Sequence, residues 1–461
     1  MNGQRVFDFL NWSITDHTDE TLFEGVFQLR GGQYSEIQLR TLSLRKPGAK
    51  LDVEKWYNLD PAPFNGDFNT AVDRIRTLLT KSVDIHLRAD VPIGSCLSGG
   101  LDSSAIVCLA NKSLRSLNSE SLQKTFSACV KVKHLDERKF MEEVVKATGV
   151  QAHFVYPTSE DLFNTYKQIG WHQDEPFGSS SIHAQWTIFK LAAENNVKVM
   201  LDGQGADEQL AGYHNFFGPY FAGLFKRGRW LRLFTEMRAT KILHKHSYTK
   251  SIKWIGNMLL PEGIRQSLRG WNGKANSRPN WINFEKLGAN PGDPFTDIGF
   301  KSSSIRDFSV AQLSASNLQM LLHWEDRDSM AHSIESRVPF LDHEFVECVV
   351  SLPDSFKLKA GVTKRVLRSA MAEALPPSIT HRMDKLGFVT PEEFWLREEA
   401  TEKFRDALIS AIENSEGILN QNILATFEEI VAGRRPFSQV IWRVISFGAW
   451  METFKVTAPY K

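Results

Sequence analysis

Short apolar runs alternate with helical patterns between residues 91 and 201. We predict strands and helices in turn over 91–97, 103–111, 125–132, 136–148, 152–156, 183–195 and 197–201, with strands first, third, fifth and last. Strands that alternate with helices pair in parallel, and the helices cover both faces of the sheet. The pattern therefore predicts an α/β fold, in which ligands bind at the carboxyl ends of the strands.

A proline-rich break precedes this region. Pro61-Ala62-Pro63 separates a strand-rich start from a helical pattern that begins at Asp67. Apolar residues recur there at intervals of three to four, so one stripe of the helix faces the core. They are Phe68, Val72, Ile75, Leu78, Leu79, Val83 and Leu87. We place a domain boundary at the break, between residues 1–60 and residues 61–461.

A glycine-containing loop follows the first predicted strand. Residues 98–104 are Ser-Gly-Gly-Leu-Asp-Ser-Ser. Gly99 and Gly100 let backbone N–H groups approach an anion, the serines add hydroxyl donors, and the next helix adds the positive end of its dipole. The loop predicts a pyrophosphate site. Taken alone, it is equally compatible with a Gly-Ser turn that caps a helix at Ser103.

A second such loop, residues 202–208, has the sequence Asp-Gly-Gln-Gly-Ala-Asp-Glu after the last predicted strand. Asp102 in the first loop would repel a phosphate unless a cation lay between them, which implies Mg²⁺. Asp207 would bring a second carboxylate to the same ion. The two loops together predict a nucleotide site with Asp102 and Asp207 as magnesium ligands.

Four segments also carry a resemblance to a known family. They are residues 98–103, 201–213 (LDGQGADEQLAGY), 328–342 (DSMAHSIESRVPFLD) and 382–388 (RMDKLGF). Together they resemble the synthetase half of glutamine-dependent asparagine synthetases, from about Phe7 to the C-terminus. The resemblance implies an adenine nucleotide α-hydrolase-like ATP-pyrophosphatase fold, a parallel sheet with helices on both faces, followed by a largely helical C-terminal part.

The chemistry implied by the resemblance is ATP-dependent amide formation, with ATP and Mg²⁺ as cofactors. A carboxylate attacks the α-phosphate of ATP, pyrophosphate leaves, and an amine captures the acyl-adenylate. Aspartate is the first candidate acid, and ammonia or another amine is the acceptor. β-Lactam-forming synthetases and lasso-peptide cyclases share the fold, so a ligase for another acid stays an alternative.

The resemblance also implies which residues bind ATP. The residues that match the pyrophosphate cradle are Ser98, Gly99, Gly100, Asp102 and Ser103. The positions whose backbone matches the adenine and ribose contacts are Leu97, Ala128 and Gly203.

Two further residues match the family's chemistry. Lys385 corresponds to a catalytic lysine whose ammonium neutralises charge on phosphorus and then on carbon. Its alternative is a solvated surface lysine. Arg337 would hold a substrate carboxylate bidentately, and its alternative is a structural ion pair with Glu335.

Gln204 departs from the family pattern. Asparagine synthetases often carry Glu there, and a carboxylate could assist deprotonation of the attacking ammonia. A glutamine amide cannot accept that proton at neutral pH. Either the nucleophile arrives neutral, or Glu335 helps to remove its proton, or Gln204 shapes the pocket for a different acceptor.

The N-terminus departs further from full-length members, which begin with a glutaminase domain whose nucleophilic cysteine follows the initiator Met. Here Asn2 follows Met1, and the first cysteine is Cys96. Residues 7–59 resemble only the tail of that domain and its crossover. We expect a fragment, a natural form that uses free ammonia or a separate glutaminase subunit, or a decayed homologue.

Composition narrows the partners and the compartment. The chain has 42% hydrophobic and 24% charged residues and a net charge of +1, which argues against an overall electrostatic partner. Four scattered cysteines, Cys96, Cys108, Cys129 and Cys348, suggest reduced thiols and a cytoplasmic location. We expect no signal peptide and no membrane span, and a homodimer is compatible with the sequence.

One basic and aromatic stretch, residues 226–274, favours other functions. It could track a nucleic-acid backbone or a lipid surface, but amphipathic helices with solvated Lys and Arg explain it better. A zinc site at His244-Lys245-His246 lacks further ligands at suitable spacing. A tRNA-acting ATP-pyrophosphatase and a non-catalytic remnant are the two rival functions, and we expect no nucleic-acid or membrane partner.

Overall fold

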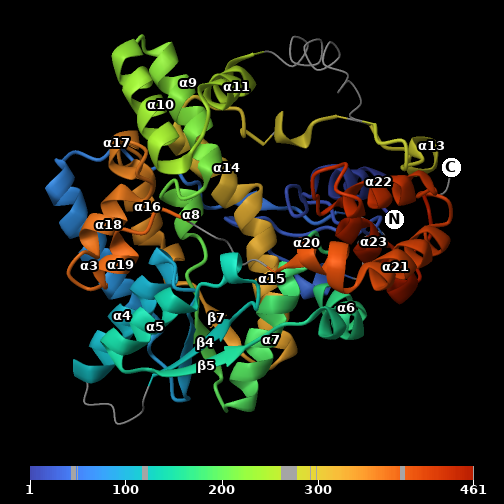
Figure 1. Ribbon diagram of the computed structural model, residues 1–461, viewed down its shortest axis with the longest axis horizontal. Coiled ribbons are helices and arrows are strands. Elements are labelled where there is room, and N and C mark those ends of the chain that lie inside the picture. Colours follow the sequence, from blue (N-terminus) through green and yellow to red (C-terminus); the bar gives the residue numbers. More distant parts are fainter. Residues whose placement is uncertain are drawn as a thin grey trace.

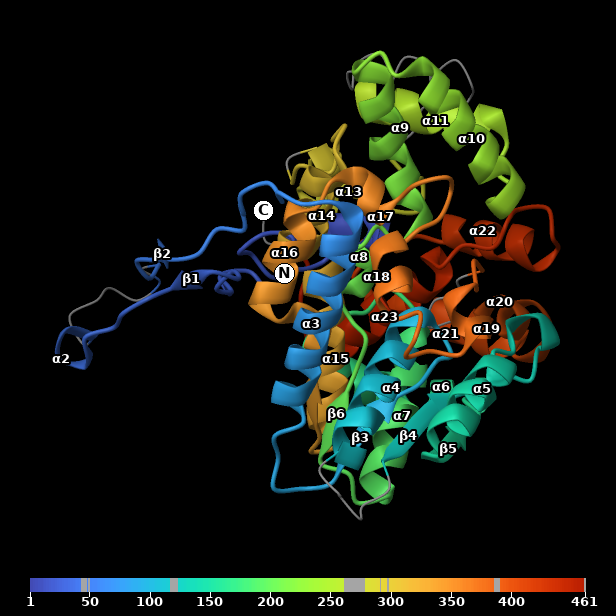
Figure 2. The same cartoon turned by 90° about the vertical axis from the view of Figure 1, so that its left-hand side faces the viewer.

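A five-stranded parallel sheet lies in the lower half of the molecule as drawn in Figures 1 and 2. The computed structural model describes residues 1–42, 48, 50–116, 123–260, 278–290, 292–296, 298–384 and 390–459. In spatial order the strands are β5 (Gln151–Val155), β4 (Lys124–Ala128), β3 (Ile93–Cys96), β6 (Val199–Leu201) and β7 (Glu335–Arg337). Every neighbouring pair is parallel. The predicted α/β fold is confirmed.

Four of these strands coincide with the predicted ones, although their ends differ. The strand expected over 125–132 ends at Ala128, where its pairing with Val155 of β5 also ends. The fifth strand, β7, was not predicted, because Glu335, Ser336 and Arg337 are polar and short strands of that kind carry no apolar signature.

Helices cover both faces of the sheet. On one face, α4 (Leu101–Ser116) and α5 (Arg138–Thr148) share a core with the ends of β3 and β6. On the other face, α7 (Ser181–Glu194) packs Ile188 and Phe189 against Phe126 and Met200. Both faces are therefore buried, as expected for a parallel sheet.

The predicted amphipathic helix is α3 (Phe68–His86). The Asp67 side chain caps its first turn by accepting a hydrogen bond from Thr70 N at 2.8 Å. Its buried stripe, which includes Ile75 and Leu79, packs against α16 (His343–Ser351) and α18 (Arg365–Ala370). This packing brings α18, from a distant part of the sequence, to the sheet.

The two ends of the chain share a second core. Phe7 and Phe9 are buried with Trp442 and Trp450, so the N-terminal turns pack against α23 (Val440–Phe454) and its neighbours. Figure 1 shows the N- and C-termini at the same side of the molecule. The largely helical C-terminal part that we expected is therefore packed against the start of the chain.

Two parts project from this body. The antiparallel pair β1 (Gln33–Tyr34) and β2 (Glu54–Lys55) extends away from it in Figure 2. The helices α9 (Phe217–Lys226), α10 (Trp230–His244) and α11 (Tyr248–Leu259) rise above it in Figure 1.

These three helices contain most of the basic and aromatic stretch. Trp254 packs against Phe217, whereas Trp230 and Phe234 are exposed. Trp271 lies outside the described residues. The expectation that the aromatic residues pack inward therefore holds only for some of them.

The remaining elements complete the fold. The other helices are α1 (Gly3–Phe7), α2 (Leu39–Leu42), α6 (Ser159–Gln173), α8 (Ala206–Gln209), α13 (Phe284–Leu287), α14 (Ile305–Ser314), α15 (Asn317–Ala331), α17 (Asp354–Lys357), α19 (Pro377–Thr380), α20 (Glu392–Phe394), α21 (Thr401–Asn414) and α22 (Asn422–Val431). Two π-helical turns span Asp8–Trp12 and Trp395–Glu399, and 3-10 turns span Lys133–Leu135, His214–Phe216, Pro294–Thr296 and Pro339–Leu341. Within the described residues, none of these helices combines the length and apolar character that a bilayer crossing requires.

Candidate active site

The loop between β3 and α4 is held in a fixed shape. Gly99 has a φ of +72°, and a Cβ at this position would lie 2.8 Å from the Cβ of Phe140, so only glycine fits. The Ser103 hydroxyl accepts from Ser98 N at 3.2 Å and contacts Ser98 Oγ at 3.0 Å. The serines therefore organise the loop at the start of α4, where the helix dipole favours anions.

The loop after β6 lies directly against the first one, because β3 and β6 are neighbouring strands. A Cβ on Gly203 would lie 3.1 Å from both Asp102 Cβ and Ser103 N. Gly203 therefore permits the two loops to touch. The two glycine-containing loops meet at the carboxyl edge of the sheet, as the strand order requires.

Lys364 joins the carboxylates of the two loops. Its ammonium donates to Asp102 Oδ2 and lies 2.6 Å from Asp207 Oδ1. The lysine side chain is 4% exposed, and burial lowers its pKa while the carboxylate of Asp102 acts against that shift. Asp102 and Asp207 thus converge on one cation.

A cavity of about 200 Å³ opens at this junction. Predicted residues that line it are Ser98, Gly100, Asp102, Ser103, Gly203, Gln204 and Asp207. Further cations in its wall are Lys364, Arg368 and Arg382, and burial lowers the pKa of Arg368. The cavity therefore combines carboxylates, cations, hydroxyls and a helix N-terminus, which suits a phosphate ester with a metal ion.

Three other residues predicted to contact ATP are not among those that line the cavity. Gly99 shapes the loop, and its carbonyl accepts from Arg382 at 3.1 Å. Leu97 is buried, its N–H donates to Phe126 O and its carbonyl accepts from Ser127 Oγ. Ala128 ends β4 and packs in the core beside the sheet.

Gln204 faces a buried acid. Gln204 is near enough to Glu325 to act against the rise of its pKa, and Glu325 accepts a hydrogen bond from Ser336 Oγ. Burial, and then the charge of nearby Asp202, raises the pKa of Glu325 well above its usual range. A carboxylate at position 204 would oppose this second buried carboxyl, so an amide fits the site better.

Tyr213 also lines the cavity and is held by Glu208. Glu208 accepts hydrogen bonds from Tyr213 Oη at 2.8 Å and from Asn317 Nδ2 at 2.7 Å. Burial raises the pKa of Glu208 and, together with the neighbouring carboxylate, the pKa of Tyr213. This network fixes the position of Tyr213 at the cavity.

Arg382 fastens the segment before the predicted catalytic lysine. Besides Gly99 O, it donates to Glu137 and to Asp384 O at 2.9 Å, and its guanidinium lies 3.9 Å from the centre of the Phe140 ring. Met383 and Asp384 line the cavity. Lys385 itself lies outside the described residues.

Comparison with known proteins agrees with this geometry. The asparagine synthase family model matches residues 74–452. The chain belongs to the asparagine synthase family.

Several curated relatives are similar over most of the chain. An asparagine synthetase [glutamine-hydrolyzing] 1 of Bacillus subtilis (strain 168) is 29% identical over 420 residues, which are 88% of this chain and 63% of the relative. A putative asparagine synthetase of Mycobacterium tuberculosis (strain H37Rv) is 27% identical, over 94% of this chain and 65% of the relative. An amidase, chry2, of Gibberella zeae is 22% identical, over 90% and 69%. The chain thus spans about two thirds of the length of these relatives.

Two predicted residues of this family member, Glu335 and Arg337, are not among the residues that line the cavity. Glu335 pairs with Val199 at the beginning of β6, and Arg337 donates to the carbonyls of His86 and Arg88. The Arg337 Nε lies 2.8 Å from Glu335 Oε1. The register places Glu335 beside the first residue of β6 and Arg337 beside Leu201, its last residue, but the Arg337 side chain turns back to Glu335 and to the carbonyls of His86 and Arg88, which precede β3. The structure therefore shows the ion pair that was the alternative interpretation.

Several residues that line the cavity of this asparagine synthase family member were not predicted from the sequence. Lys364 is the N-cap of α18, Arg368 lies within that helix, and Arg382 follows α19. A signal existed in the close spacing of Lys364, Arg365 and Arg368. The pairing of Lys364 with Asp102, 262 residues earlier, could not be derived from local pattern.

Proposed function

We propose that this chain is an ATP-dependent, amide-forming ligase that adenylates a carboxylate and transfers ammonia or an amine to it. One observation carries the proposal: two glycine-containing loops at neighbouring strand ends converge, through Asp102 and Asp207, on the buried ammonium of Lys364. Family membership supports this type of reaction.

The pyrophosphate part of ATP would lie against the first loop. Ser98, Gly100 and Ser103 line the cavity at the start of α4, so backbone N–H groups and the helix dipole are available to phosphate oxygens. Gly203 borders the same space for the ribose. Leu97 and Ala128 stay predictions for adenine, through their backbone alone.

The donor set fits Mg²⁺, since two carboxylates approach one cationic centre beside the proposed phosphate site. Asp102 and Asp207 would hold the ion. When bound, Mg²⁺ would neutralise charge on the phosphate oxygens. Without it, the ammonium of Lys364 prevents repulsion between the two carboxylates.

Lys364 would stabilise the charge that develops as pyrophosphate leaves. A preorganised ammonium in a buried cavity needs little reorganisation during the reaction, which is the usual source of electrostatic catalysis. Lys385, three residues after Arg382 in the chain, is proposed to act on the same charge and then on the tetrahedral carbon. Arg382 holds the segment that precedes it.

Recognition of the acid is proposed to use the cavity's own cations, with Arg368 first. Arg368 donates to the carbonyls of Thr363 and Thr380 but lines the cavity. Arg337 does not line it and pairs with Glu335, so it is poorly placed for a substrate that reacts at the loops. Aspartate is the first acid to test. Deprotonation of an ammonium nucleophile by Gln204 is not part of the proposal, because an amide is no base at neutral pH.

Exchange of radioactive pyrophosphate into ATP tests the proposal directly. We expect exchange that depends on Mg²⁺ and on one carboxylic acid from a panel that begins with aspartate. Exchange with another acid would change the substrate and keep the mechanism, and exchange with no acid would overturn adenylation.

The acceptor needs a second assay, in which amide formation is compared with ammonia and with glutamine as nitrogen donors. We expect ammonia to support turnover. Turnover with glutamine by this chain alone would contradict the expected dependence on free ammonia or a separate glutaminase.

A further inference from the structure

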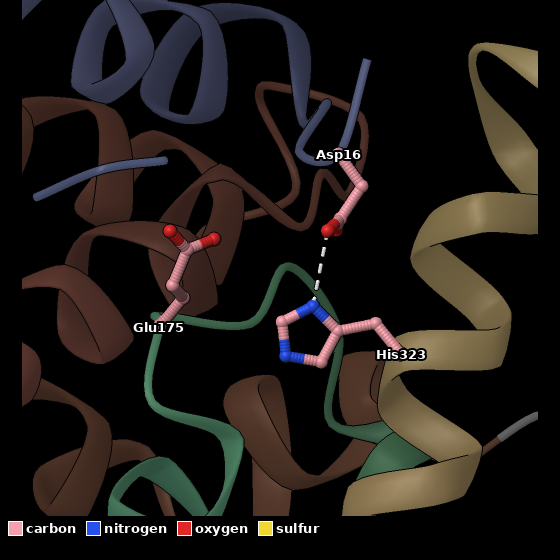
Figure 3. Close-up of side chains that lie close together, drawn as sticks. All are labelled: Asp16, Glu175 and His323. Atoms are coloured by element: carbon pink, nitrogen blue, oxygen red, sulfur yellow. Dashed lines mark hydrogen bonds and ion pairs between the residues drawn. The ribbon is translucent and has the colours of Figure 1, made fainter. Parts of the chain in front are cut away.

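A second group of titratable side chains lies outside the cavity. Asp16 comes from the N-terminal segment, Glu175 from the loop after α6, and His323 from α15. One potential ligand atom from each lies within 4.8 Å of the other two. Figure 3 shows the three side chains pointing toward one another, and all three are largely buried.

The His323 ring is oriented from behind. Its Nε2 lies 3.0 Å from the backbone carbonyl of Gln173, which is an obligate acceptor. Its Nδ1 faces Asp16 Oδ1 at 3.1 Å. A ring nitrogen that donates to a backbone carbonyl fixes the tautomer and leaves the other nitrogen to face a ligand, which is the usual arrangement of a metal-binding histidine.

The two carboxylates are also supported by outer partners. Asp16 Oδ2 accepts from Thr15 Oγ1 at 2.8 Å, and Glu175 Oε1 accepts from Leu22 N at 2.7 Å. Each carboxylate therefore has one oxygen engaged by a neutral donor. Such partners orient metal ligands without competing in charge.

From this geometry we propose that Asp16, Glu175 and His323 bind one divalent transition-metal ion, with Zn²⁺ as the first candidate. The ligands would be one imidazole nitrogen and two carboxylate oxygens, with a fourth position for water. Ligands around a tetrahedral Zn²⁺ are about 3.3 Å apart, given metal–ligand bonds of about 2.0–2.1 Å. The 3.1 Å separation of His323 Nδ1 and Asp16 Oδ1 already matches that spacing.

Binding would exchange a proton for the ion. In the metal-free protein both ring nitrogens of His323 face acceptors, so both carry protons. The metal would replace the proton on Nδ1, and that proton would leave to solvent. Nε2 would keep its proton and its hydrogen bond to Gln173 O.

A nearby histidine shows what an ordinary ion pair looks like in this fold. His17 Nε2 lies 3.1 Å from Asp8 Oδ2, the same separation as in the other pair. Here, however, Arg5 contacts both the ring and the carboxylate, and the second carboxylate nearby, Glu20, pairs with Arg5. At the proposed site Arg30 donates to the backbone carbonyl of Asp16, and Glu175 supplies a second carboxylate within reach of the imidazole.

The site would fasten three distant segments. It ties the N-terminal segment to α15, whose Leu321 lines the nucleotide cavity. The ion would therefore stabilise the fold around the cavity without taking part in the reaction there. The proposal does not depend on the proposed function.

Metal binding to untagged, chelator-treated protein tests the proposal, because an affinity tag would itself bind the ion. ZnCl₂ is titrated by calorimetry, the bound metal is counted by elemental analysis, and Co²⁺ absorption reports an imidazole ligand. Variants are Asp16→Asn, Glu175→Gln and His323→Gln, with Asp174→Asn as the control that removes an adjacent carboxylate bonded to Arg327.

We expect one Zn²⁺ per chain in the wild type and in Asp174→Asn. The three ligand variants should bind Zn²⁺ about 10–100-fold more weakly. Loss of a residue that only supports a metal ligand has an effect of that size, and loss of the ligand itself should be at least as large. Asp102→Asn should keep this ion, which separates the site from the nucleotide cavity. A wild type that binds no Zn²⁺, or a Glu175→Gln variant that binds it with unchanged affinity, would overturn the proposal. If a variant fails to fold, the Co²⁺ spectrum of the wild type still decides whether the imidazole is a ligand.

Discussion

The carboxyl and amino ends of the parallel sheet both pair carboxylates with cations, but they do so differently. At the carboxyl end, Asp102 and Asp207 share Lys364 at the edge of a cavity. At the amino end, Glu335 pairs with Arg337, whose remaining hydrogen bonds go to backbone carbonyls. Only the first arrangement presents its charges to a ligand.

The difference follows from the direction of the strands. Loops at the carboxyl ends of β3 and β6 lead into helix N-termini, which attract anions, and adjacent strands bring these loops into contact. On the other side, Arg337 donates to the carbonyls of His86, the last residue of α3, and Arg88, and carbonyls at the end of a helix attract cations. Similar residue types therefore support a site at one end and structure at the other.

Replacement of Lys364 by Met should produce the largest effect. The variant loses the cation between Asp102 and Asp207, so pyrophosphate exchange should fall by about 10²–10³-fold. The Lys364→Arg variant keeps the positive charge but not the shape of the ammonium group. Its exchange rate should therefore lie between those of the wild type and of Lys364→Met. Exchange rates at saturating ATP, with circular dichroism to verify folding, measure the effect. Exchange within about 2-fold of wild type would show that the lysine is only structural.

Lys357 offers a matched control. It is also fully buried, on α17, and its Nζ has no hydrogen-bond partner among the described residues. Lys357→Met should therefore leave exchange unchanged.

Lys357 should also make the free energy of unfolding depend on pH. Burial lowers the pKa of Lys357 from 10.5 to about 8. Because the unfolded chain still binds the proton that the folded chain has lost, stability should rise with pH between about 8 and 10.5. Lys357→Met should lack that rise in urea unfolding experiments, and an equal rise in both proteins would contradict the assignment.

The two ends of the sheet also differ in how far sequence could predict them. The Ser98 loop and the Asp202 loop each carry local signals, and the strand pattern placed them at the same edge. Lys364 carries no such signal, because it reaches Asp102 only after α18 packs on α3. Long-range packing, rather than local propensity, completes the site.

The positions of the Glu335 and Arg337 side chains could not be derived in the same way. The motif that contains them matches the family, and the register sets Arg337 beside Leu201 at the end of β6, but the Arg337 side chain turns back to Glu335. A single sequence reveals neither the pairing of β7 with β6 nor the direction of that side chain. The alternative ion pair, a local feature, was the part that could be derived.

Arg382 tests how the carboxyl end is held, and its replacement should have the second-largest effect. Arg382→Gln leaves the partly buried Glu137 without its guanidinium and frees the Gly99 carbonyl. We expect the free energy of unfolding to fall by about 3 kcal/mol and the KM for ATP to rise. Urea unfolding and exchange kinetics measure both.

Arg138 provides the control for that prediction. It pairs with Asp136 at 2.6 Å, next to Glu137 in the sequence, but its side chain is 43% exposed. Arg138→Gln should leave both the free energy of unfolding and the KM for ATP close to their wild-type values, because exposed ion pairs contribute little. Equal losses in the two variants would mean that Arg382 has no special role in the loop.

The smallest effect is expected at the amino end. The Glu335 side chain is 61% exposed, and its contact with Arg337 is an ion pair that water screens. Glu335→Gln should therefore change exchange and ammonia-dependent amide formation by no more than about 2-fold, as for most exposed substitutions. The two assays separate possible roles, because a base for the amine would affect amide formation and spare exchange. A loss of 10-fold or more in amide formation alone would restore Glu335 as that base and would require β7 to present it to the substrate. Unchanged rates in both assays would confine the chemistry to the carboxyl end.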